Sequence, residues 1–359
     1  MTTHRPDVPV HRLSRRQLIK HTGAFVAAGL VSGVMGACSR GNTATQRTGR
    51  EPSTITVLSS FGTFGRDAYL WVAKAKGFYD EAGITVDIQP GAGTGSNISA
   101  MAAGAAHFAS FDAMGGILAH GAQVVEGGDG AGIRLLALAQ QRTLAAFLTL
   151  DPDITDPRDF AGRTVAVAPG GGTALLLPTW LQHHGVDPGR VEVVHFPPPE
   201  LIPVLVQGVV DVADQYVVGV PMVEAAAGRT PTVFPIGDTL SDALGVGIWA
   251  AEDVAQKWPD LCRRFRDATL KGLAYALEHP DEAGQILHQA DPTSNPDHAA
   301  EELRLMQPYT FTAPNTPLGA VTTTQLARAI ALLEATSAIP AGTTPDDLAD
   351  PAVMLGGTW

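Results

Sequence analysis

The sequence predicts an α/β protein of two lobes, in which each lobe is a mostly parallel sheet flanked by helices. Short runs rich in Val, Ile and Leu alternate with helical patterns from residue 54 onward, which is the order of elements in parallel α/β layers. The alternation stops at the polar, proline-containing segment 151–161 and then restarts. The chain has 359 residues, which is enough for two lobes of ordinary size.

The first lobe is expected to comprise residues 54–142 together with 237–359. Apolar and β-branched runs predict its strands at 54–58, 84–88, 107–110 and 133–139. Apolar residues at helical spacing predict its helices at 68–76, 97–103 and 113–120. Asp67 is a suitable cap for the first of these helices, and Gly77 ends it. The part after Gly237 is expected to be mainly helical and to pack on this lobe.

The second lobe is expected over residues 143–236, where strands and helices alternate again. Its strands are expected at 145–150, 164–168, 191–196 and 210–214, and its helices at 173–184 and 201–207. In open α/β sheets of this kind, ligands bind beyond the carboxyl ends of the strands, where loops lead into helices. A ligand-binding site is therefore expected in the loops that follow these strands.

The N-terminus carries the pattern of an export signal. The basic segment 14–20 (SRRQLIK) precedes a short apolar stretch at 22–37, too short for an ordinary membrane-spanning helix. The pair Arg15-Arg16 resembles the twin-arginine export motif. Residues 1–37 are therefore predicted to be a signal peptide, and both the twin-arginine and the general export route remain open.

Cys38 is the predicted lipidation site. The residues Met35-Gly36-Ala37-Cys38 resemble a bacterial lipobox, in which small residues precede an acylated cysteine, with palmitate among the expected acyl groups. Residues 38–53 are polar and lack an apolar pattern, as in a flexible tether. The chain is therefore expected to be lipid-anchored in the cell membrane on its extracytoplasmic face. A chance cysteine behind an ordinary signal is the alternative.

Charge and cysteine content exclude several classes of protein. The formal net charge is −12 and the signal region is basic, so the folded body is strongly acidic and would repel a phosphate backbone; no nucleic-acid partner is expected. The two cysteines, Cys38 and Cys262, lie far apart and build neither a disulfide framework nor a metal pair. No metal and no cofactor is predicted, and Cys262 is read as a buried thiol.

Four segments carry a resemblance to a known family. They are YLWVAKAKGFYDEAGITVDI, AMAAGAAHFASFDA, DPRDFAGRTVAVAPGGG and LVQGVVDVADQYVVGVPMVEAA, in this order within about 53–230. Together they resemble the binding proteins for taurine, aliphatic sulfonates, nitrate and thiamine-pyrimidine precursors. The resemblance implies the type II periplasmic-binding fold, with a small-molecule ligand in the cleft between two lobes. It also implies an ABC permease and its ATPase as partners.

The loops that follow the predicted strands supply the candidate ligand-binding residues. Two of these loops, 91–97 and 169–173, are glycine-rich and precede helices, so their backbone N–H groups can approach a ligand closely, although the glycines can equally serve only tight turns. Neither loop has the spacing of a nucleotide-binding motif. The predicted ligand-binding residues are Phe61, Phe64, Arg66, Thr94, Ser96, Asn97, Phe111, Asp112, Gln140, Gly171, Thr173, Asp214 and Tyr216.

The side chains in these loops favour a flat heteroaromatic ligand. Aromatic rings beside amide and carboxylate groups suit a heterocycle that bears N–H or amino groups, such as a thiamine pyrimidine precursor or a flavin. Some of these rings can instead be core fillers. An oxyanion such as a sulfonate, taurine or nitrate would require helix N-termini and a cation, for which only Arg66 and Arg142 lie near the loops.

An enzyme is not expected. Fungal pyrimidine-synthesising proteins resemble this fold, but they use a cofactor-binding lysine, a histidine and a cysteine-rich segment. No cysteine cluster exists here, and the lysines beyond the signal are Lys74, Lys76, Lys257 and Lys271. No metalloprotease motif or nucleophile elbow occurs. A ligand-sensing adaptor for a partner kinase and a pyrimidine-synthesis-like enzyme remain the alternatives from other classes.

Overall fold

The computed structural model describes residues 49–169, 172–311 and 317–350, all of which belong to one compact unit, 43–359. The predicted signal peptide, the lipidation site Cys38, most of the predicted tether and Gly171 lie outside the described residues. None of the described helices is long and apolar enough to cross a membrane.

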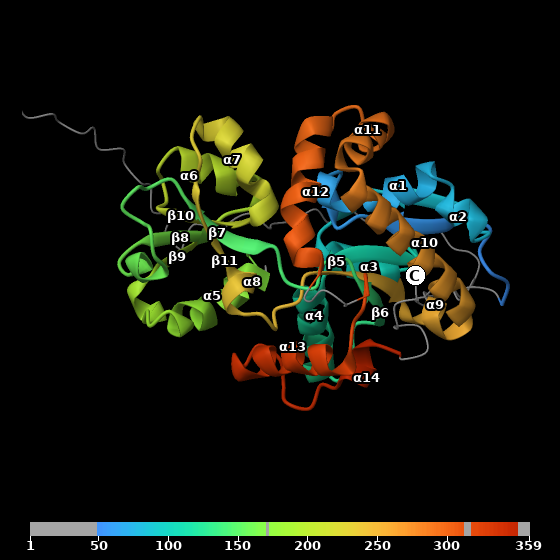
Figure 1. The fold of residues 1–359 in the computed structure, drawn as a ribbon. Coiled ribbons are helices and arrows are strands. Elements are labelled where there is room, and N and C mark those ends of the chain that lie inside the picture. Colours follow the sequence, from blue (N-terminus) through green and yellow to red (C-terminus); the bar gives the residue numbers. More distant parts are fainter. Residues whose placement is uncertain (1–48, 170–171, 312–316, 351–359) are drawn as a thin grey trace, which may run out of the picture. The chain divides into compact units, whose positions relative to one another are not determined.

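The first sheet is built from two segments that are distant in the sequence. Its strand order is β3-β1-β5-β12-β6. The strands are β1 (Ile55–Leu58), β3 (Val86–Gln89), β5 (Phe108–Asp112), β6 (Ile133–Leu138) and β12 (Val246–Ala251). The flanking helices are α1 (Tyr69–Ala75), α2 (Phe78–Glu81), α3 (Thr94–Ala102) and α4 (Ala113–Val125) (Figure 1). Parallel pairing joins β1 to β3 and β5, whereas β12 runs antiparallel to β5 and β6.

The C-terminal part contains the helices α9 (Glu252–Lys257), α10 (Pro259–Glu278), α11 (Pro280–Ala290), α12 (Pro296–Thr310), α13 (Thr323–Ala335) and α14 (Pro345–Leu348). Helix α10 contacts α1, and α13 contacts α4. The expectation of a mainly helical part overlooked the strand β12. Its sequence VGIWAA is an apolar run that is buried on both faces, and such a run has no alternation to distinguish it from a buried helix.

The second sheet has the strand order β11-β7-β10-β8-β9. Its strands are β7 (Ala145–Thr149), β8 (Thr164–Val167), β9 (Glu192–His195), β10 (Val212–Tyr216) and β11 (Thr232–Pro235), with helices α5 (Gly172–His183), α6 (Leu201–Val206), α7 (Val220–Ala227) and α8 (Ile236–Thr239). Here β8 pairs in parallel with β9 and β10, and β7 runs antiparallel to β10 and β11. The predicted α/β class with two sheets flanked by helices is confirmed.

The chain passes between the two sheets twice. Residues 139–144 lead from β6 to β7, and residues 236–245 lead from β11 back to β12. In each sheet one strand is antiparallel to its neighbours, β7 in the second and β12 in the first. Each of these two strands directly follows one of the passages, and the remaining strands of each sheet share one direction. The lobe boundaries at 142/143 and 236/237 stay predictions.

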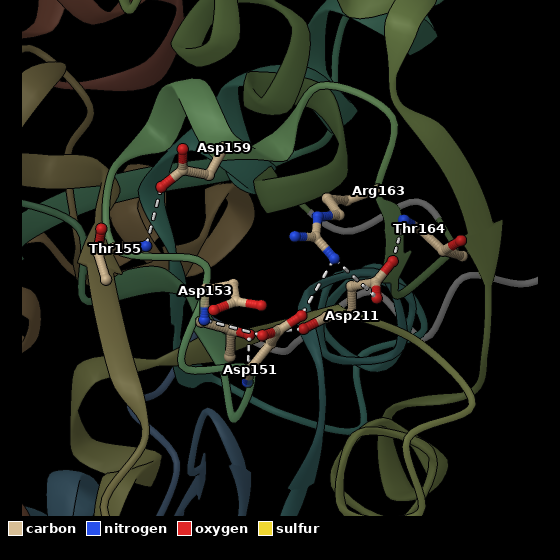
Figure 2. Close-up of polar contacts among 8 residues, drawn as sticks. Asp151, Asp153, Thr155, Asp159, Arg163, Thr164 and Asp211 are labelled. Atoms are coloured by element: carbon tan, nitrogen blue, oxygen red, sulfur yellow. Dashed lines mark hydrogen bonds and ion pairs between the residues drawn. The ribbon is translucent and has the colours of Figure 1, made fainter.

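Polar contacts fix the end of the second sheet at which β8 and β10 begin. Arg163 lies 3.1 Å from a carboxylate oxygen of Asp151 and 3.8 Å from one of Asp211, and the backbone N–H of Thr164 donates to Asp211 at 2.8 Å (Figure 2). We call Asp151, Arg163, Thr164 and Asp211 the far-edge cluster. Because β7 is antiparallel, its carboxyl end brings Asp151 to this edge. The cluster therefore joins the ends of three strands.

A capped turn lies next to the far-edge cluster. Asp156 and Asp159 form a reciprocal capping box around residues 157–160. Asp159 accepts the N–H group of Thr155 at 3.0 Å (Figure 2) and that of Asp156 at 2.9 Å. The Arg158 guanidinium beside Asp156 holds the pKa of that carboxyl at about 2. This turn ends with Phe160, whose buried ring packs on Trp180 at a centroid distance of 5.2 Å and so ties the turn to the lobe core.

Candidate functional site

A cavity of about 990 Å³ lies at the carboxyl ends of the strands and is lined by residues of both sheets' loops. Its volume is at the upper end of the range for small-molecule sites, about 300–1,000 Å³. Most of the residues predicted to bind a ligand line it: Phe61, Phe64, Arg66, Thr94, Ser96, Phe111, Asp112, Gln140, Thr173, Asp214 and Tyr216. The strand-end rule brings these distant residues together because the strands of each sheet end at one edge.

Three aromatic rings face the cavity with accessible surface. Phe61 is 40% exposed and Tyr216 is 39% exposed, so part of each ring surface is accessible. Phe61 stacks on Phe64 with 6.3 Å between the ring centroids and 15° between the planes. Phe111 differs because it is 1% exposed and stacks on Trp249 at 4.9 Å. Phe61, Phe64 and Tyr216 are therefore free to cover a ligand, whereas Phe111 mainly fills the core beneath the cavity.

Asp112 ends β5 and caps α4. Its carboxylate accepts the backbone N–H of Gly115 at 2.7 Å. It also reaches toward the second lobe, since a Cβ on Gly172, the first residue of α5, would lie 3.4 Å from its Oδ1 atom. Burial raises the pKa of Asp112 to about 6, although the N–H groups of Gly115 and Met114 oppose the rise. Burial thus shifts the balance of this carboxyl toward its protonated form.

Asp214 occupies the matching position in the second lobe, near the end of β10. It accepts the backbone N–H of Ala168 at 3.3 Å and the hydroxyl of Thr173 in the first turn of α5. Burial raises the pKa of Asp214 to about 7. Tyr216 lies two residues further along the same strand. Although part of its ring is accessible, protein surrounds its hydroxyl, and this burial and then the carboxyls of Asp112 and Asp214 raise the pKa of Tyr216.

Arg66 is the one cationic side chain among the described residues that line the cavity. Its guanidinium lies 4.5 Å from the Phe64 ring centroid and 5.4 Å from that of Tyr216, so it contacts both lobes. Glu302 on α12 lies 4.0 Å from the guanidinium and accepts the backbone N–H of Arg66 at 3.0 Å. The positive charge of Arg66 is therefore offset by a buried carboxylate.

The first turn of α3 lies at the cavity. Thr94, Gly95 and Ser96 line the cavity, and the N-cap residue Gly93 provides no side-chain cap. The loop before them approaches β1 so closely that a Cβ on Gly91 would lie 1.9 Å from the carbonyl oxygen of Ser59. Glycine at this position lets the loop bring the start of α3 to the cavity.

Asn97 was predicted to bind the ligand, and it is not among the described residues that line the cavity. It is 1% exposed and its amide donates to the carbonyl groups of Ser59 at 2.8 Å and Ser110 at 3.2 Å, while its oxygen accepts the N–H of Ala92 at 3.1 Å. Its polar atoms hold the loop against β1 and β5. A buried amide that is satisfied in this way serves the fold.

Gln140 lines the cavity, but its polar atoms are engaged elsewhere. Its oxygen accepts the N–H of Val246 at 2.9 Å, and its amide contacts the Met306 sulfur at 3.0 Å. Arg142 pairs with Asp238 at 3.0 Å and does not line the cavity. Among the described residues, no group of His, Cys, Asp and Glu side chains is arranged to hold a metal ion.

Several lining residues were not predicted from the sequence. Glu302 comes from α12, far along the chain from every loop that was considered. The apolar walls come from helix faces rather than loops: Met114, Leu118, Leu176, Ile202 and Met222. Their sequence signal is the ordinary pattern of an amphipathic helix, and only the packing of the two lobes shows which of them meet the cavity.

The sequence and the fold are similar to those of known proteins. The taurine-binding periplasmic protein of Escherichia coli K12 is 27% identical over 213 residues, which are 57% of this chain and 61% of that protein. The periplasmic aliphatic sulphonate-binding protein SsuA of Escherichia coli has a TM-score of 0.66 at 15% identity, covering 86% of this chain and 96% of that chain. The desulfurization enzyme DSZB has a TM-score of 0.55 at 17% identity, covering 83% and 97%.

These structural likenesses show the two-lobed fold of periplasmic binding proteins, as predicted. One of the similar proteins is a binding protein and another is an enzyme, so the fold leaves the activity to be argued from the cavity. The match to the taurine-binding protein spans about three fifths of that relative. Residues 67–283, more than half of the chain, match the family described as NMT1/THI5 like, and the protein belongs to that family.

Proposed function

We propose that this protein is the extracytoplasmic, lipid-anchored solute-binding protein of an ABC importer and that it captures a small heteroaromatic compound by closure of its two lobes. The observation that carries the proposal is the cavity itself. It takes accessible aromatic rings from both lobes and places a carboxyl group from each lobe beside them. A permease with its ATPase is the partner that such a protein would serve.

The chemistry of the lining favours a heterocycle with N–H groups. Phe61, Phe64 and Tyr216 offer ring faces for stacking, which is worth about 0.5–1.5 kcal/mol beyond the buried area. Asp112 and Asp214 offer oxygen acceptors to amino or ring N–H groups. A thiamine pyrimidine precursor or a flavin combines a flat ring with such donors.

The lining supports capture rather than catalysis. The described residues that line the cavity include no Cys, Lys or His, and their titratable groups are Arg66, the carboxyls of Asp112, Asp214 and Glu302, and the phenol of Tyr216. Lobe closure is the mechanism that the cavity supports, since a ligand that contacts both lobes shifts the population toward the closed form. Arg66 already contacts an aromatic ring of each lobe and would move with this closure.

An oxyanion-bearing solute is the second candidate. The uncapped start of α3 supports it, because free backbone N–H groups at a helix N-terminus favour negative charge. The taurine-binding relative supports it as well. Against it, Asp112 caps the N-terminus of α4, and Arg66 is paired with Glu302.

A thermal-shift series on the full chain in detergent tests the ligand class. The series contains the thiamine pyrimidine, riboflavin, taurine, an alkanesulfonate and nitrate. A ligand at about a hundred times its Kd stabilises the protein by about 2.7 kcal/mol, which is a clear rise in Tm. We expect the rise with a heterocycle, and less of it for Tyr216→Ala. A rise with oxyanions alone would replace the first candidate by the second.

The lipid anchor has its own test. Cys38→Ala removes the only thiol that the lipobox offers for acylation. We expect wild-type protein in the membrane fraction and the variant in the soluble fraction of the cell envelope. Cys262→Ala is the matched control, because that buried thiol lies in the folded body and its loss should leave the protein in the membrane fraction. Membrane retention of the Cys38 variant would refute the anchor.

A further inference from the structure

We infer that the ligand carries a positively charged group and that this group is held between Asp112 of the first lobe and Asp214 of the second. The inference rests on the proposed function, since it takes the cavity to be the solute site. It adds the charge of the solute, which the ring-stacking argument leaves open. It applies equally to a cationic heterocycle and to an amino-bearing sulfonate.

Both carboxyl groups line the cavity beside the first turn of α5. Asp112 comes from the end of β5, and its Oδ1 lies beside Gly172 at the start of α5. Asp214 comes from β10 and accepts the hydroxyl of Thr173, the next residue of the same turn. Both carboxyls also act electrostatically on Tyr216. One aspartate from each lobe therefore flanks the first turn of α5.

The charged groups around this point leave negative charge without a counterion. Arg66 is the cation that faces the cavity from the first lobe, and Glu302 pairs with it. Asp67 is buried beside Arg66 and accepts the hydroxyl of Ser60. Asp112 and Asp214 receive hydrogen bonds from N–H and hydroxyl groups, and within the described residues no ion pair joins either of them to a cation.

A cationic solute would supply the missing counterion. Burial disfavours the ionised form of each carboxyl, and an ammonium or protonated amidine bound to both would reverse this preference. Its binding drives the protons still held by Asp112 and Asp214 into solvent. Since the ionised carboxylates bind the cation, affinity should rise from about pH 5 to about pH 8 and then level off, provided that the solute stays protonated. A neutral solute of the same shape gains no such advantage.

Two matched pairs of probes test the charge apart from the scaffold. The first pair is the thiamine pyrimidine in its aminomethyl and hydroxymethyl forms, and the second is taurine and isethionate. Each pair exchanges an ammonium for a hydroxyl. Titration calorimetry on the full chain at about pH 8 shows which pair binds. Within that pair, the ammonium compound should bind at least about tenfold more tightly than the hydroxyl compound, because charge-assisted hydrogen bonds are about twice as strong as neutral ones. Repetition at about pH 5 should shrink this ratio.

The variants Asp112→Asn and Asp214→Asn should each reduce the ratio of ammonium to hydroxyl affinity to within about threefold of unity. Asp153 is an exposed aspartate beside the far-edge cluster, and Asp153→Asn should leave this ratio unchanged. Thermal melts of the ligand-free variants identify any that fail to fold, and Asn is itself an effective helix cap. The inference would be overturned if the ammonium and hydroxyl compounds of the pair that binds had equal affinities. It would also be overturned if neither ammonium compound bound at about 10 mM. A preference seen only with taurine would uphold the charge and refute the heterocycle.

Discussion

Aspartates occupy both ends of the second lobe's sheet, and the two ends differ in whether these aspartates have a cationic partner among the described residues. At the far edge, Asp151 and Asp211 meet the guanidinium of Arg163, and Asp211 also accepts a backbone N–H. At the cavity end, Asp214 accepts hydrogen bonds only from N–H and hydroxyl groups of the described residues. Asp112, which lines the cavity from the first lobe, likewise accepts hydrogen bonds but has no cationic partner among these residues. Aspartate side chains thus stabilise the fold at the far edge, whereas at the cavity end they lack a cationic partner among the described residues and can serve a ligand.

The pKa directions show the same contrast. In the turn beside the far-edge cluster, N–H groups hold the pKa of Asp159 below its usual value, so its contribution to stability is present near neutral pH and is lost as the pH falls through the lowered pKa. Burial raises the pKa of Asp112 to about 6 and of Asp214 to about 7. Between about pH 4 and 7 the folded state then binds more protons than the unfolded state, so the free energy of unfolding falls as the pH rises.

The largest expected effect comes from neutralising the cavity aspartates. In the ligand-free protein at about pH 8, the double variant Asp112→Asn/Asp214→Asn should raise the free energy of unfolding by up to about 7 kcal/mol, because two buried charges disappear. Denaturant unfolding measures this. The gain should vanish near pH 4, where the folded wild type holds both protons. An unchanged or lower stability at about pH 8 would remove the contrast between the two ends of the sheet.

An intermediate effect on the free energy of unfolding is expected at Asn97. This residue tests whether a polar side chain stabilises the fold through its hydrogen-bond partners, even when it lies near the cavity. Asn97 lies near the cavity but its amide is fully engaged with Ser59, Ser110 and Ala92. Asn97→Ala should lower the free energy of unfolding by about 2 kcal/mol, because it leaves buried backbone groups without partners. Ser96→Ala is the neighbouring control and should change stability by less than about 0.5 kcal/mol. A neutral Asn97 variant would mean that these hydrogen bonds do not hold the loop.

The smallest effect is expected at the far edge. Asp211→Ala removes the acceptor of the Thr164 N–H and one partner of Arg163, and should lower the free energy of unfolding by about 1 kcal/mol. Asp153 is exposed in the same region (Figure 2), and Asp153→Ala should stay within about 0.5 kcal/mol of the wild type. Equal losses in both variants would indicate a general charge effect rather than the specific contacts of the cluster.

The sequence predicted the strand ends well and their side-chain partners poorly. Asp112, Asp214 and Tyr216 were placed at the cavity because the carboxyl ends of strands share one edge, which follows from sheet topology. The roles of Ser96 and Asn97 were not separable, since adjacent residues on a helix differ only in the direction they face. Glu302 was missed because its link to Arg66 exists only after α12 packs on the first lobe.

Strand β12 also has a consequence for the order in which the protein is made. It lies between β5 and β6, yet it is synthesised only after the whole second lobe. Until it emerges from the ribosome, β5 and β6 each present an unpaired edge, and such edges are sites of misassembly. The first lobe to begin is therefore the last to be completed, and a nascent chain that stalls before residue 246 would hold a finished second lobe beside an open first one.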